Sequence, residues 1–113
     1  MRVLPFLALL FLSSGCVGSV CGPSCQKIYG SDEGECAIPV PGYEPEELLA
    51  QCLDMCREAA SVTGDVGDYD PDERVPSNQE VTLENRAQAK LWAECIEQTD
   101  CSDINDGYCA PIY

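Results

Sequence analysis

Apolar residues recur at steps of three and four along residues 45–61, and this is the period of a helix with one buried face. Pro45 suits the first turn of a helix, and the glutamates around it favour a helix N-terminus. Cys52 and Cys56 fall one turn apart on the inward side. The pattern predicts a central helix that carries two cross-links, and its apolar positions are Leu48, Leu49, Cys52, Leu53, Met55, Cys56, Ala59 and Ala60.

A second stripe of the same period predicts a long helix over about residues 79–100. Ser77 and Glu80 have the spacing of a capping box in front of it. A short helix is expected from about Pro23 to Tyr29, because Pro is tolerated in a first helical turn and Gly30 suits its end. The apolar positions of the second long helix are Val81, Leu83, Ala87, Leu91, Trp92, Cys95 and Ile96.

The segments between these helices read as loops. Residues 31–43 are rich in Gly and Pro and are expected to form an ordered loop held by Cys36. Residues 65–77 have no apolar period and are expected to form the most exposed and mobile loop. The whole pattern predicts a small all-α fold with two long helices and a short N-terminal one.

Three aspartates of the second loop fall on alternate positions, as at the start of a calcium-binding loop. They are Asp68, Asp70 and Asp72. The sixth place of such a loop requires Gly and holds Glu73, and the twelfth requires Glu and holds Gln79. A solvated acidic loop is therefore the favoured interpretation, and the three aspartates remain a weak calcium candidate.

Cysteine content and charge narrow the class of protein. Nine cysteines among 113 residues indicate a disulfide-stabilised domain from an oxidising compartment. The net charge of −14 would repel nucleic acid and anionic lipid surfaces. The chain has no His, no C-x-x-C motif and no recognisable catalytic motif. We expect neither an enzyme nor a resident cofactor.

The N-terminus has the pattern of a secretory signal. Arg2 precedes ten nearly unbroken apolar residues, too few to span a bilayer as an anchor. The sequence Leu12-Ser13-Ser14-Gly15-Cys16 that follows resembles the lipobox of bacterial lipoproteins. This resemblance implies that residues 1–15 are removed and that Cys16 is acylated. It also implies that residues 16–20 tether a domain of residues 21–113 to a membrane, and Val17 in place of Asp implies the outer membrane.

One departure keeps an alternative open. The lipobox usually has Leu three residues before the Cys, where this chain has Ser13. Ser13 and Gly15 also fit an ordinary signal peptidase site, which would release a freely secreted protein. Acylation of Cys16 leaves eight cysteines, an even number, and a cut before Val20 leaves the same eight.

Cys21 and Cys25 have the same spacing as Cys52 and Cys56. The two C-x-x-x-C motifs resemble those of small helical hairpins whose helices are joined by two rungs of disulfide. For antiparallel helices this resemblance implies the pairs Cys21–Cys56 and Cys25–Cys52. The turn at Gly107 favours closure of Cys101 onto Cys109, which leaves Cys36–Cys95. This is one of about 105 connectivities that eight cysteines allow.

These observations favour a cell-envelope lipoprotein that acts as a binding or structural module. Its expected partners are the membrane, through the lipid, and a protein of the envelope. A freely secreted inhibitor or toxin-like ligand is the second interpretation. A copper(I)-binding helical protein, similar to the cysteine-rich copper-storage bundles, is a third, and free thiols would be its signature.

Overall fold

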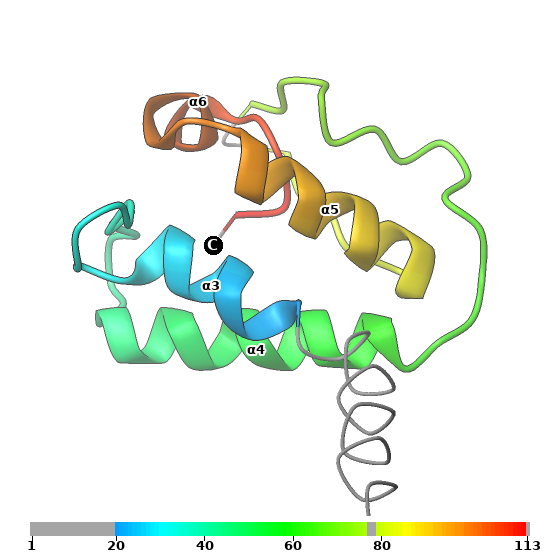
Figure 1. The fold of residues 1–113 in the computed structure, drawn as a ribbon, viewed down its shortest axis with the longest axis horizontal. Coiled ribbons are helices and arrows are strands. Elements are labelled where there is room, and N and C mark those ends of the chain that lie inside the picture. Colours follow the sequence, from blue (N-terminus) through cyan, green and yellow to red (C-terminus); the bar gives the residue numbers. More distant parts are fainter. Residues whose placement is uncertain (1–19, 77–78, 113) are drawn as a thin grey trace, which may run out of the picture.

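The computed structural model describes residues 20–76 and 79–112, and within these ranges the protein is all-α (Figure 1). The leader and Cys16 therefore lie outside the described residues. The predicted class, a small all-helical protein with four disulfides, is confirmed. The helices are α3 (Cys21–Tyr29), α4 (Pro45–Ala60), α5 (Arg86–Gln98) and α6 (Cys101–Asp106).

Helices α3 and α4 form an antiparallel pair, and α5 packs against both of them (Figure 1). The disulfides Cys21–Cys56 and Cys25–Cys52 join the pair, with Cα–Cα distances of 5.6 Å and 5.8 Å. These are the two pairs that the hairpin resemblance implies. All four cysteines are buried, so the two rungs form one wall of the core.

The ends of α4 follow from its sequence. Glu44 accepts a hydrogen bond from the N3 backbone with its side chain, and Glu47 accepts from the backbone N–H of Glu44 at 2.8 Å. This reciprocal capping box, together with Pro45, fixes the start of the helix. The helix ends at Ala60, one residue before the predicted end, where the Ser61 hydroxyl donates to the carbonyl of Glu58 at 2.7 Å.

Helix α5 begins later than the sequence pattern predicts. The predicted start near residue 79 is wrong, because Asn85 is the N-cap and its Oδ1 accepts from the Gln88 N–H at 3.0 Å. The Asn85 amide also donates to the Asp65 carbonyl at 2.8 Å. Because Asn85 caps the helix and is also bound to the preceding loop, it determines the helix start in place of the upstream capping box. Ser77 of that capping box lies outside the described residues.

The core is small and centres on α5. The side chain of Trp92 is fully buried, and its indole N–H donates to the Pro111 carbonyl at 3.2 Å. Ile28, Leu48, Ile96 and Ile104 are also almost completely buried around it. The only Trp of the chain is thus a core residue held by the C-terminal segment, and it offers no exposed face for ligand stacking.

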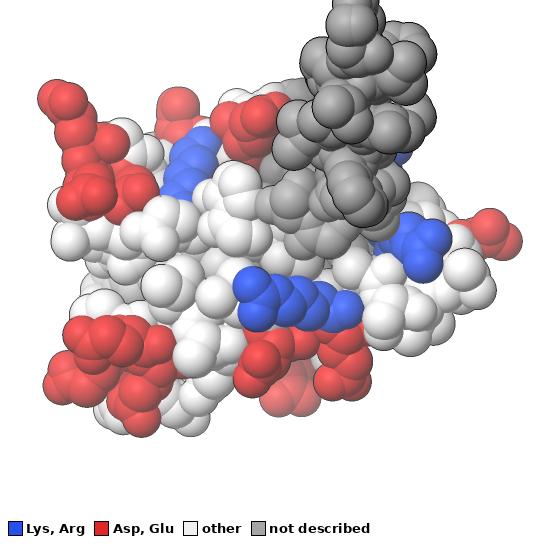
Figure 2. Space-filling view, turned by 60° about the horizontal axis from the view of Figure 1, so that its bottom comes forward, with Lys and Arg blue, Asp and Glu red and all other residues white. Residues whose placement is uncertain are grey.

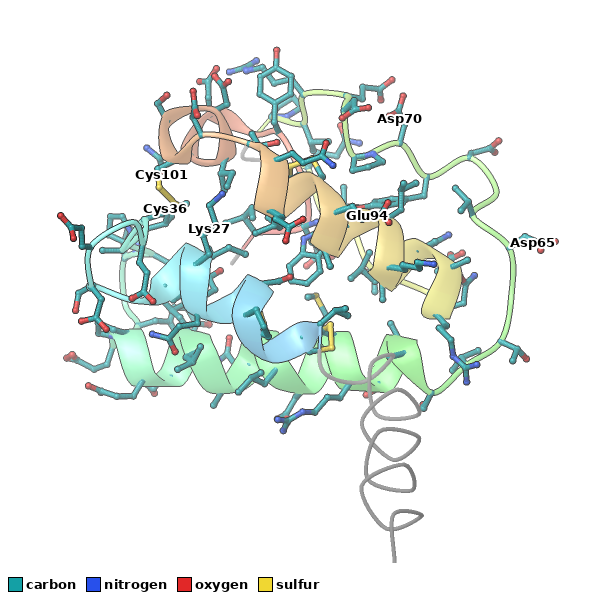
Figure 3. The ribbon with its side chains drawn as sticks, in the orientation of Figure 1. Lys27, Cys36, Asp65, Asp70, Glu94 and Cys101 are labelled. Carbon is teal, nitrogen blue, oxygen red and sulfur yellow. A yellow bond between two sulfur atoms is a disulfide. The ribbon has the colours of Figure 1, made fainter. Side chains whose placement is uncertain are left out.

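The other two disulfides differ from the predicted pairs. The predicted pairs Cys36–Cys95 and Cys101–Cys109 are wrong, since the structure joins Cys36 to Cys101 and Cys95 to Cys109. The segment after α5 is not a simple turn, because the chain starts a new helix, α6, at Cys101. This helix presents Cys101 to the 31–36 loop (Figure 3), and the residues after it bring Cys109 to the buried Cys95 of α5.

Candidate functional site

All eight cysteines from Cys21 to Cys109 are paired with one another in the four disulfides. The chain has nine cysteines, and the one that remains is Cys16, which lies outside the described residues. Every described cysteine already has a partner, so none is left to form an intramolecular bridge with Cys16.

The three aspartates of the weak calcium candidate do not converge. Asp68, Asp70 and Asp72 are all exposed, and Asp70 uses its Oδ1 to accept the N–H of Asp72 at 3.0 Å. Asp70 points away from the body of the protein (Figure 3). Within the described residues no group of three or more Cys, Asp or Glu side chains could hold a metal ion.

The loop that contains these aspartates is attached to the C-terminal segment. It runs around the outside of the molecule from α4 towards α6 (Figure 1). Tyr69 donates its hydroxyl hydrogen to the Ala110 carbonyl at 2.6 Å, and the Cys109 N–H donates to the Pro71 carbonyl at 2.8 Å. Burial first, and then the charges of Asp70 and Asp72, raises the pKa of the Tyr69 hydroxyl well above its ordinary value. The sequence pattern missed this anchoring because one tyrosine hydroxyl and backbone groups supply it, and these leave no periodic signal.

The described residues form an open groove of about 500 Å³, which we call the proline groove. Chain segments far apart in the sequence line it, including the Pro-rich loop, the last turn of α6 and the segment that follows α6. Four of its lining residues are prolines: Pro39, Pro41, Pro76 and Pro111. The volume lies within the roughly 300–1,000 Å³ that is typical of ligand pockets.

The floor of the proline groove is apolar and its rim is polar. Ile38, Leu48 and Ile104 line it and are 7%, 2% and 1% exposed, so they belong to the core. At the rim, Tyr43 is 50% exposed and is one of the largest exposed apolar side chains among the described residues. Such a groove can bind an apolar group of a ligand on its floor, while the rim selects the polar groups of the ligand that lie next to it.

Acidic side chains supply the charge of the rim. Glu80 and Asp106 are the charged residues that line the groove, and both are exposed. Arg74 contacts Asp106 through an ion pair of 3.2 Å between Nε and Oδ2, with both side chains more than half exposed. An exposed pair of this kind contributes little to stability and can exchange partners.

A second, shallower cavity of about 350 Å³ lies between α3 and α5, next to Val20. Lys27 and Lys90 line it together with Glu94 and Glu97. The Lys27 ammonium is already bound to backbone carbonyls of Ile96, Glu97 and Thr99. This cavity therefore has no strong excess of either charge with which to select a ligand.

The sequence analysis did not predict the proline groove. Its residues come from five separate segments, and only the folded chain brings them together. The one local signal was the Ile38-Pro39-Val40-Pro41 run, in which apolar residues alternate with prolines inside a loop. Apolar residues in an exposed loop that are not all needed by the core are a feature of binding surfaces.

The outer surface is strongly acidic in places. Figure 2 shows acidic side chains gathered at the edges of one face, with uncharged residues and basic side chains between them. Among the described residues, no helix is long and apolar enough to cross a membrane.

Comparison with protein-family models, with curated proteins and with solved structures finds no match for this chain. The function has to be inferred from the chemistry of its own residues.

Proposed function

We propose that this protein is a lipoprotein of the bacterial cell envelope, in which acyl chains on Cys16 hold a disulfide-stabilised binding module at the membrane. The observation that carries this proposal is the pairing of the cysteines. Eight of the nine are joined to one another, and the ninth follows a hydrophobic leader and small residues. An unpaired thiol is unusual in an exported protein, and acylation would remove it.

The domain acts by binding. Its four disulfides are typical of exported domains that have too small a core to be stable without cross-links. The proline groove supports a binding role, because it combines an apolar floor with a polar rim. We place the protein in the outer membrane, on the basis of Val17 directly after the acylated cysteine.

The freely secreted form is the second candidate, favoured by Ser13 and Gly15 as an ordinary cleavage site. A copper(I)-binding function has less support. Copper(I) prefers thiolate ligands, and all eight described cysteines would first have to be reduced to provide them.

The test is incorporation of an alkyne-tagged palmitate in growing bacterial cells, followed by fractionation. We expect the wild-type protein to carry the tag and to remain with the membranes. Cys16→Ser should lose the tag, whereas Ser19→Ala, a matched change in the tether, should keep it. Untagged wild-type protein in the culture medium would instead establish the freely secreted form.

A further inference from the structure

We infer that the proline groove binds a segment of a partner polypeptide in which large apolar side chains lie next to Lys or Arg. The inference rests on the proposed function in one respect, namely that the domain acts by binding. It does not depend on acylation of Cys16, so the two can fail separately.

The apolar part of the ligand follows from the floor of the groove. Ile38, Leu48 and Ile104 form this floor, and the half-buried Val40 and Val81 line its sides. An apolar side chain that enters the groove removes its own surface and that of the two valines from water. The groove has room for a few side chains and not for a folded domain.

The charge of the ligand follows from the rim. Glu80 and Asp106 line the groove, and none of the Lys and Arg residues that the structure describes does so. Arg74 reaches Asp106 without lining the groove. With a net charge of −14 on the whole chain, an acidic peptide, a fatty acid or a second copy of this protein meets like charge, whereas a cationic segment is attracted.

Hydrogen-bonding capacity favours the same ligand. The four prolines have no N–H, and the N–H groups of Ile38, Val75 and Gly107 donate to other carbonyls of the chain. The carboxylates of Glu80 and Asp106 accept hydrogen bonds from ammonium or guanidinium groups. The side-chain amides of Gln51, Gln79 and Asn105 also line the groove, and they can both donate and accept hydrogen bonds. The half-exposed ring of Tyr43 adds a face on which a cation can lie.

The experiment uses the mature protein, purified in a non-ionic detergent, and two dye-labelled peptides. One carries Leu-Phe-Leu between two lysines, and the other carries Leu-Phe-Leu between two glutamates. Fluorescence anisotropy should show binding of the lysine peptide, weakened by salt, and at least about tenfold weaker binding of the glutamate peptide. Amide NMR shifts should move for groove residues such as Val40 and Val81 when the lysine peptide is added.

Variants of the protein separate the groove from the general acidity of the surface. Glu80→Gln should weaken binding of the lysine peptide by about two- to fivefold. Glu94→Gln removes the same charge from α5 and should leave binding unchanged, since Glu94 does not line the groove and belongs to the shallower cavity between α3 and α5 (Figure 3). Val81→Arg should weaken binding by at least about tenfold, because it places a cation among the lining residues.

Circular dichroism and a thiol assay verify that each variant keeps its helices and disulfides, and Glu80→Gln provides the test if Val81→Arg does not fold. Equal binding of both peptides overturns the inference, as does equal weakening by Glu80→Gln and Glu94→Gln. Self-association of the protein through the groove overturns it as well. None of these results bears on whether Cys16 is acylated.

Discussion

The ammonium of Lys27, on α3, lies 2.6 Å from the carbonyl oxygen of Ile96, in the last turn of α5. It also donates to the carbonyls of Glu97 at 3.2 Å and Thr99 at 2.9 Å. Helix α5 has no basic residue of its own in its last turn, and its final carbonyls need partners. A lysine from a helix far away in the sequence thus caps α5 and complements its dipole.

Lys27 also connects the two sides of a disulfide. Its own carbonyl accepts the N–H of Cys36 at 2.7 Å, and its side chain binds Thr99, two residues before Cys101. Cys36 and Cys101 therefore meet beside Lys27, in the arrangement seen in Figure 3. The capping lysine and the disulfide support the same junction between α3, the 31–36 loop and α6.

Lys27→Met tests the cap. We expect the free energy of unfolding to fall by about 1–2 kcal/mol, because three helix-end carbonyls lose a charged donor in a half-buried place. Thermal unfolding monitored by circular dichroism should detect this as a lower Tm. Lys90→Met, an exposed change on α5, is the control and should alter the Tm little. Equal stability of the two variants would mean that the cap contributes nothing.

Peptide mapping without reduction tests the disulfide connectivity. Cleavage after Glu97 separates Cys95 from Cys101, and cleavage at Asp103 and Asp106 separates Cys101 from Cys109. We expect one fragment that joins Cys36 to Cys101, because both lie next to Lys27. A fragment that joins Cys36 to Cys95 would contradict the fold, since it requires the 31–36 loop to cover a buried part of α5.

A helix whose start and buried face are specified within one continuous stretch of sequence could be predicted. Contacts between stretches that are far apart in the sequence could not. Helix α4 is periodic and carries its own cap, so its start and its inward cysteines follow from the sequence. The start of α5 depends on Asn85, whose amide binds Asp65 across the chain. The position of Cys101 depends on Lys27, which binds the Thr99 carbonyl two residues before it. Neither this contact nor the one between Asn85 and Asp65 leaves a periodic signal in the sequence.

The candidate site was still harder to predict. Cys16 could be singled out because the leader and the lipobox-like residues are contiguous. The proline groove could not, because Tyr43, Glu80 and Asp106 come from three segments that share no pattern. Only the folded chain, in which α6 and the Pro-rich loop both line the groove, brings these residues together.

Ala37→Gly tests a strained position in the 31–43 loop. Ala37 has a φ of 45°, in the left-handed region that favours glycine, and its side chain is exposed. We expect the substitution to raise the free energy of unfolding by about 1 kcal/mol, as measured by urea denaturation. Ala50→Gly in α4 is the matched control and should lower it by about the same amount. A loss of stability in both variants would show that the loop position is not strained.

Tyr69→Phe tests the attachment of the acidic loop. At neutral pH it should lower the free energy of unfolding by about 1 kcal/mol, because the hydrogen bond to the Ala110 carbonyl is lost. The raised pKa means that the folded protein keeps the Tyr69 proton when the unfolded chain, with a pKa of about 10, releases it.

This contribution to stability is present below about pH 10 and is lost as the pH rises above it, by up to about 1.4 kcal/mol per pH unit. Urea denaturation of wild type and Tyr69→Phe at increasing pH measures the difference. We expect the stability of wild type to fall to that of Tyr69→Phe as the pH rises above about 10, and to fall below it at higher pH. Tyr43→Phe, which changes an exposed tyrosine and leaves Tyr69 in place, is the control and should lose stability with rising pH as wild type does.

The intact mass of the mature protein, isolated from the membranes of a bacterial host without reduction, tests the central claim most directly. We predict a chain that begins at Cys16 and carries two or three acyl chains, because a single chain gives only marginal anchoring. The same mass should leave no free thiol among the eight other cysteines. A chain that begins at Val20, or an unmodified Cys16, would contradict the account.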